Sequence, residues 1–140
     1  KIKITIDERQ SAEDAFLRNI YLSITANNNL IEKKFETSDD CVVTSDIKDY
    51  DNDKNPEIII IAKSGGSGGY GIIHFLEFEN DQLLNIELPE LNNEIYKLYR
   101  GSDKFTLQDK TFIREFPAYT VNDANCCPTK SDTLTQKRCR

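Results

Sequence analysis

The first part of the chain alternates between apolar and polar residues. Apolar side chains occupy every second position in residues 2–6 and again in residues 20–24. This period of two is typical of a half-buried β-strand, because successive side chains point to opposite faces of a sheet. Three consecutive asparagines at 27–29 favour a turn, since asparagine tolerates positive φ, and residues 30–35 are expected to return as the hairpin partner of residues 20–24.

Helical patterns occur in two regions of the chain. Ser11 and Asp14 have the spacing of a capping box that opens a short helix. A longer helix over residues 12–25 is the alternative to the strand at 20–24, because apolar residues also recur there at every fourth position. Apolar residues at helical spacing within residues 89–100 predict another short helix.

The middle of the chain carries the clearest strand patterns. Residues 41–44 are β-prone, and residues 57–62 (EIIIIA) form a nearly unbroken apolar run, as in a strand that is buried on both faces. Residues 72–78 are predicted to form the next strand. After a turn at Asn80-Asp81, residues 82–88 are expected to continue the meander.

The last third of the chain contains one predicted hairpin, formed by residues 105–107 and 111–116. Pro117 and Pro128 are expected to interrupt the chain after it. Successive strands with short turns indicate a mainly β fold, an antiparallel β-sandwich or flattened barrel with one or two short helices. The 140 residues show no repeat or linker, so we expect a single β-rich domain over residues 1–140.

The charge of the chain narrows the choice of partners. The formal net charge is −6, and the only basic cluster lies at residues 137–140. Nucleic-acid binding needs a field of lysine and arginine, so we do not expect it, whereas an acidic surface favours encounter with basic partners. No apolar run approaches the about 20 residues that span a bilayer. The sequence leaves a homodimer open.

The cysteines and the first residues indicate an exported protein. The chain contains no methionine and starts without a signal-like apolar segment, which suggests a mature product in the periplasm or outside the cell. An even count of four cysteines fits two disulfides there. Neighbouring cysteines rarely bridge each other, so Cys126 and Cys127 are expected to pair with Cys41 and Cys139 in one of two ways. A zinc site is disfavoured because the cysteines lack ligand spacing.

The segment DYDNDKNPE carries an oxygen-bearing side chain at every second position: Asp49, Asp51, Asp53, Asn55 and Glu57. Calcium takes about six to eight oxygen ligands, which a curled acidic loop supplies. The spacing opens like an EF-hand but lacks the glycine and the final glutamate of that motif. An Asx-rich turn, whose side chains bind local amides, accounts for the same residues. A calcium-stabilised extracellular interaction module is therefore one functional hypothesis.

The segment KSGGSGGYG, residues 63–71, holds five of the six glycines. It lacks the Gly-Lys-Ser/Thr ending and the following helix of a P-loop, which disfavours nucleotide binding. Glycines permit a narrow backbone, so the segment is expected to present Ser67 and Tyr70 to a partner; a slack hairpin turn is the structural alternative. His74 is expected to be a structural residue of a strand. We predict no catalytic residues and no enzymatic activity.

The order of several pieces resembles the bacterial periplasmic inhibitors of invertebrate-type (i-type) lysozyme. The resemblance covers roughly residues 46–130. Its pieces are DYDNDKNPE at 49–57, the apolar strand after it, SGGSGGYG at 64–71, LPEL at 88–91, YRGSD at 99–103, FIREFPAY at 112–119, and DAN at 123–125 leading to Pro128-Thr129.

This resemblance implies a secreted, β-rich inhibitor whose loop enters the active-site cleft of a lysozyme. Carried onto this chain, Ser67, Gly68 and Tyr70 are the inhibitory residues, and Gly69 belongs to the same partner-binding segment. Lysozymes work with two carboxyl groups that flank the scissile bond. Hydroxyl donors from Ser67 and Tyr70 are therefore suited to bind those acids while the loop blocks the substrate. The acidic body of the inhibitor would steer it towards a basic enzyme.

Overall fold

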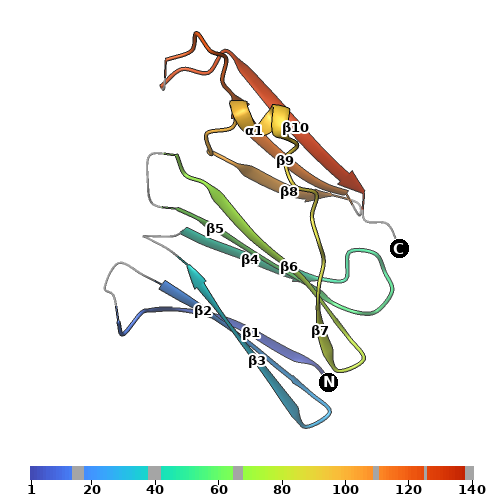
Figure 1. Cartoon of the computed structure of the whole chain (residues 1–140). Coiled ribbons are helices and arrows are strands. Elements are labelled where there is room, and N and C mark those ends of the chain that lie inside the picture. The colour runs from blue at the N-terminus through green and yellow to red at the C-terminus, as the bar shows by residue number, and fades with distance from the viewer. Residues whose placement is uncertain (14–17, 38–41, 65–67, 109–110, 125, 138–140) are drawn as a thin grey trace.

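The protein folds into three antiparallel β-sheets and one short helix, as a computed structural model shows (Figure 1). The structure describes residues 1–13, 18–37, 42–64, 68–108, 111–124 and 126–137. The first sheet contains β1 (Lys3–Gln10), β2 (Arg18–Ala26) and β3 (Asn29–Thr37) in that order. The second has the order β4 (Val42–Lys48), β5 (Glu57–Lys63), β6 (Gly71–Glu79) and β7 (Gln82–Asn85). The third has the order β10 (Lys130–Lys137), β9 (Thr111–Ala118) and β8 (Lys104–Gln108), and α1 (Asn93–Leu98) precedes it.

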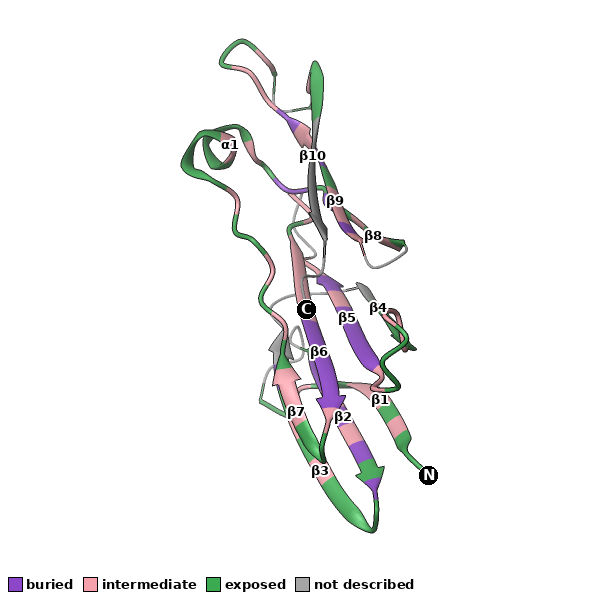
Figure 2. Ribbon diagram, turned by 90° about the vertical axis from the view of Figure 1, so that its right-hand side faces the viewer, coloured by how far each residue is buried: buried purple, intermediate pink, exposed green. Residues whose placement is uncertain are grey.

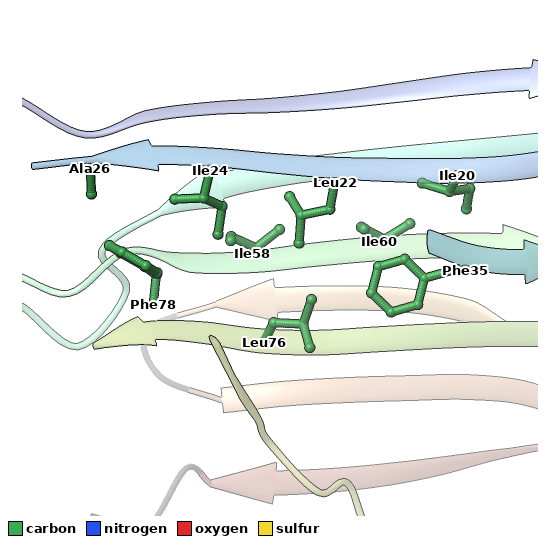
Figure 3. Packing of buried hydrophobic residues seen from close by; sticks show 9 residues of the cluster. All are labelled: Ile20, Leu22, Ile24, Ala26, Phe35, Ile58, Ile60, Leu76 and Phe78. Carbon is green, nitrogen blue, oxygen red and sulfur yellow. The ribbon is translucent and has the colours of Figure 1, made fainter. Parts of the chain in front are cut away.

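The main hydrophobic core lies between the first and second sheets (Figure 3). Residues of β2 and β3 face residues of β5 and β6 across this interface, and several are fully buried. The cluster contains Ile20, Leu22, Ile24, Ala26, Phe35, Ile58, Ile60, Leu76 and Phe78. Burial of each large apolar side chain contributes about 2 kcal/mol, so this interface dominates the stabilisation of the fold.

The other face of the second sheet packs against the third sheet, which makes β5 and β6 the middle of three layers (Figures 1 and 2). Phe75 of β6 points away from the main core, and its ring centroid lies 6.4 Å from that of Phe112 in β9. Phe105 of β8 stacks on Phe112 at 5.7 Å. The prediction of a strand buried on both faces at residues 57–62 is therefore confirmed.

The pairing of residues confirms the predicted strands and turns of the first two sheets, except that the strand expected over residues 82–88 ends at Asn85. Asn27 and Asn28 have φ of 49° and 65°, and the hairpin β2–β3 pairs Ile24 with Ile31. The alternative helix over residues 12–25 is wrong, because β2 begins at Arg18 and its inward residues obey a period of two. Residues 14–17 lie outside the described part of the chain. Within the described residues, the mainly β fold is sandwich-like and no sheet closes into a barrel.

The prediction that Pro117 interrupts the chain is wrong. Pro117 lies inside β9, opposite Ser131 of β10. β8 pairs with β9 only as far as Glu115, so Pro117 has a single neighbouring strand, and its missing N–H is tolerated there. Pro128 does precede a new strand, β10, whose polar sequence gave no strand signal.

The helix predicted within residues 89–100 is confirmed as α1. The side chain of Asn92 caps it by accepting a hydrogen bond from the Ile95 amide at 2.9 Å, and none of its residues is buried. Of the described helices, none is long and apolar enough to cross a membrane.

Candidate functional site

The glycine-rich segment connects β5 to β6 and is closed by Ser64, the second residue of KSGGSGGYG. The Ser64 amide donates to the Tyr70 carbonyl at 2.9 Å, and the Tyr70 amide donates to Oγ of Ser64 at 2.9 Å. Residues 65–67 lie outside the described part of the chain, so the structure does not place Ser67. The described residues Gly68, Gly69 and Tyr70 lie together at the end of the β5–β6 hairpin.

A second segment, residues 99–103, holds the glycine-rich segment from the side. The Ser102 amide donates to the carbonyl oxygens of Gly68 at 2.6 Å and Gly69 at 3.2 Å. Gly101 has φ of 86°, and a Cβ atom at that position would overlap the Gly68 carbonyl. Only glycine therefore permits the two backbones to approach so closely.

Asp103 joins the two segments to the third sheet. Its buried carboxylate accepts hydrogen bonds from the Gly71 amide at 2.7 Å, from Nε of Arg114 at 2.7 Å, and from the Tyr99 hydroxyl. Nη2 of Arg114 also donates to the Tyr99 hydroxyl at 2.9 Å. The carboxylate thus fixes the start of β6, the 99–103 segment and β9 relative to one another.

The electrostatics of this cluster favour the ion pair. Burial, and then the hydrogen bond to Asp103 and its charge, raise the pKa of Tyr99, which keeps its hydroxyl a donor. Burial opposes the charge of Arg114, but the hydrogen bond and charge of Asp103 outweigh it and leave the pKa of Arg114 above its usual value. The raised pKa keeps the guanidinium of Arg114 charged near neutral pH, 2.7 Å from the carboxylate of Asp103.

Tyr70 is an exposed aromatic side chain of this site. Its ring is 47% exposed, although it packs edge-on against Tyr99 with centroids 5.6 Å apart. A Cβ at Gly68 would overlap the Tyr70 ring, so glycine at that position makes room for the ring. The site presents one aromatic hydroxyl on a backbone that the 99–103 segment and Asp103 hold in place.

The acidic segment at the other end of β5 is organised by its own side chains. Asp49 accepts from the amides of Asp53 at 3.1 Å and Lys54 at 3.0 Å, and Asp53 accepts from the Asn55 amide at 2.9 Å. Oε2 of Glu57 accepts from the Tyr50 amide at 2.6 Å. These are the bonds that an Asx-rich turn would make.

The same segment brings carboxylates close enough to share a cation. Ligand atoms of Asp49, Asp51 and Asp53 lie within 4.8 Å of one another, and so do those of Asp53, Glu57 and Glu77. Glu57 and Glu77 are opposite each other in β5 and β6, and both are buried. The side chain of Asn55 donates to Oδ2 of Asp53 at 3.2 Å. Glu77 was not predicted, because it joins the group through strand register alone.

The cysteines that the structure describes, Cys126 and Cys127, are exposed free thiols. A hydrogen bond with Cys126, and then burial, raise the pKa of the Cys127 thiol. Cys41 and Cys139 lie outside the described residues, so the predicted disulfides stay a prediction.

His74 occupies the structural position expected of it. Its ring lies 4.2 Å from that of Phe35 in the main core, and burial followed by the charge of Lys33 lowers its pKa. Nε2 of His74 is buried and has no hydrogen-bond partner among the described residues. Comparison of the chain with protein-family models, with curated proteins and with solved structures gives no match.

Proposed function

We propose that this protein is a lysozyme inhibitor that inserts the glycine-rich segment, residues 64–71, into the active-site cleft of the enzyme. The observation that carries the proposal is the combination of an exposed Tyr70 with a backbone held by Ser102 and Asp103. A binding loop held in one conformation loses little entropy on association, which strengthens binding. In this role the protein is a ligand of an enzyme and not an enzyme itself.

The chemistry of a lysozyme cleft fits what the segment offers. Two carboxyl groups flank the scissile bond of the substrate, and the Tyr70 hydroxyl is a donor for one of them. Ser67 is assigned the second donor by the resemblance to the i-type lysozyme inhibitors. The net charge of −6 favours encounter with a basic enzyme in the periplasm or outside the cell.

The experiment is an inhibition assay. Hydrolysis of bacterial cell walls by i-, c- and g-type lysozymes is measured with and without the protein. We expect inhibition of one class, and we expect Tyr70→Ala to weaken it about 30-fold, the effect of losing an interface hot spot of about 2 kcal/mol. Tyr70→Phe separates the hydroxyl from the ring.

Leu30→Ala is the matched control for this assay. Leu30 is also an exposed apolar residue, 61% exposed, but lies in the first sheet at the β2–β3 turn. Its truncation should leave inhibition unchanged. No inhibition of any lysozyme class at micromolar protein would refute the proposal.

The acidic segment supports a second candidate function, that of a calcium-stabilised extracellular interaction module. The specific observation is that Asp53 belongs to both carboxylate groups, so one cation there would contact acids from the loop and from β5–β6. Calcium at about 100 times its dissociation constant would raise the free energy of unfolding by about 2.7 kcal/mol.

Calorimetric titration with Ca²⁺, and thermal melting with and without a chelator, test this candidate. Asp53→Asn should abolish both the heat of binding and the shift in Tm, whereas Mg²⁺ serves as the control cation. Absence of both effects in the unaltered protein leaves the Asx-turn interpretation alone.

A further inference from the structure

A hollow of about 350 Å³ lies beside the candidate site and is lined by Glu90, Leu91, Tyr96, Tyr99 and Arg114. Tyr99 connects it to the glycine-rich segment, because its ring centroid lies 5.6 Å from that of Tyr70 and 6.4 Å from that of Tyr96. The three tyrosines therefore form a continuous aromatic row from the segment to α1. A partner that covers Tyr70 would also meet the hollow.

The exposure of Tyr96 is not explained by the fold. Tyr96 is 66% exposed, and α1 buries none of its residues, so the ring contributes little to the core. The end of the helix is fixed instead by backbone bonds, among them the Tyr119 amide to the Leu98 carbonyl at 3.0 Å. An exposed tyrosine on a fixed support is characteristic of protein interfaces.

The charge of the hollow is negative on balance. Arg114 lines the hollow, but Asp103 compensates that charge at 2.7 Å, and the guanidinium lies over the ring of Tyr99. Glu90 lines the hollow, is exposed, and makes no ion pair with any residue that the structure describes. A cation entering the hollow would therefore meet the carboxylate of Glu90 and the ring of Tyr96, since Arg114 already lies over the ring of Tyr99.

We propose that this hollow receives a lysine or arginine side chain of the same lysozyme that the glycine-rich segment binds. The inference rests on the proposed function and adds a second contact to it. A cation beside the ring of Tyr96 gains cation–π attraction, and the carboxylate of Glu90 pairs with the charge. The net charge of −6 likewise favours the approach of a basic partner.

The test compares pairs of variants in binding to the lysozyme class that the unaltered protein inhibits, at low and at high salt. Glu90→Gln and Glu87→Gln change the net charge equally, but Glu87 does not line the hollow. We expect Glu90→Gln to weaken binding about 5-fold at low salt, and Glu87→Gln by less than 2-fold. Tyr96→Ala should weaken binding about 5-fold, and Tyr96→Phe, which keeps a ring, by less than 2-fold.

The outcomes separate this inference from the proposed function. If the unaltered protein binds no lysozyme, the proposed function fails and the inference fails with it. If the unaltered protein binds and Tyr70→Ala weakens binding, but Tyr96→Ala and Glu90→Gln act like their controls, the inference alone is overturned. Glu90 and Tyr96 are both exposed, so we expect their variants to fold normally. Circular dichroism and thermal melting of each variant check this.

Discussion

The two polar segments that flank β5 are held in place by different means. The acidic segment before β5 is held by bonds between neighbours, such as Asp49 to the amide of Asp53 four residues later. The glycine-rich segment after β5 is held by residues far along the chain: Gly71 binds Asp103 across 32 positions. The side chains of the first segment bind mainly to neighbouring amides, whereas the second combines a local closure by Ser64 with bonds to the distant residues Ser102 and Asp103.

This difference separates the two candidate functions physically. The acidic segment should largely keep its shape when the glycine-rich segment is altered, because Asp49 and Asp53 bind neighbouring backbone amides. The glycine-rich segment should lose its shape when any of its distant supports is removed. Variants of each support can therefore test whether the two ends of β5 are independent.

The largest effect is expected from Asp103→Asn. This change leaves Arg114 partly buried without its counter-ion, since its side chain is only 18% exposed. The free energy of unfolding should fall by about 3 kcal/mol, as measured by urea denaturation. A double variant, Asp103→Asn with Arg114→Gln, should lose less than the sum of the single changes. A loss below about 0.5 kcal/mol for Asp103→Asn would contradict the long-range support of the segment.

A smaller effect is expected from Gly101→Ala, which tests the close approach of the two backbones. The new Cβ would overlap the Gly68 carbonyl at a φ of 86°, so we expect a loss of about 2 kcal/mol in the free energy of unfolding. Gly69→Ala is the matched control, because Gly69 also has positive φ, 49°, but open space around its Cβ position. It should cost only about 1 kcal/mol. Equal losses would show that backbone strain, and not contact, makes Gly101 necessary.

The pH dependence of stability near neutral pH is expected to come from His74, which belongs to neither of the two segments. His74 is the only histidine of the sequence, and its half-buried ring packs against Phe35 of the main core. Its pKa is lowered from 6.5 in the folded protein, so the unfolded chain takes up the proton first as pH falls. Stability should therefore decrease as pH falls below 6.5, by at most about 1.4 kcal/mol per pH unit. His74→Phe should make the free energy of unfolding flat between pH 7 and 5.5; a persistent slope would implicate other groups.

The smallest effect is expected from Asp49→Ala in the acidic segment. The change removes the acceptors for two backbone amides in a solvent-accessible turn and should cost about 1 kcal/mol by urea denaturation. Lysozyme inhibition should stay within 2-fold of that of the unaltered protein. A marked loss of inhibition would show that the two ends of β5 are coupled.

The contrast between local and long-range support also explains which parts of the fold could be predicted from the sequence. The alternation at residues 20–24 and the apolar run at 57–62 predicted strands correctly, because the period of a half-buried or fully buried strand is a local property. β10 was missed because its strand character depends on pairing with β9 and not on its own polar residues. The prediction for Pro117 was wrong for the same reason. β9 tolerates a proline at that position because β8 does not extend alongside it, and this cannot be predicted from the local sequence.

The residues of the candidate site also divide into those with a local sequence signal and those that depend on distant contacts. Tyr70 and the acids from Asp49 to Glu57 stand out in the sequence through composition and spacing. Asp103 and Glu77 do not, because one reaches the site through a loop and the other through strand register. The close approach of Gly101 to Gly68 gives only a weak signal, a lone glycine within YRGSD.

The attachment of the glycine-rich segment to residues 101–103 also has a consequence for the order in which parts of the protein are expected to fold. We expect contacts between positions more than thirty residues apart to form late, because a long loop must close before they form. The β5–β6 hairpin can pair first, while its connecting segment still samples many conformations. The segment then acquires its final shape when the third sheet docks. Completion of folding and readiness to bind would thus coincide, and a half-folded chain would not yet engage a target.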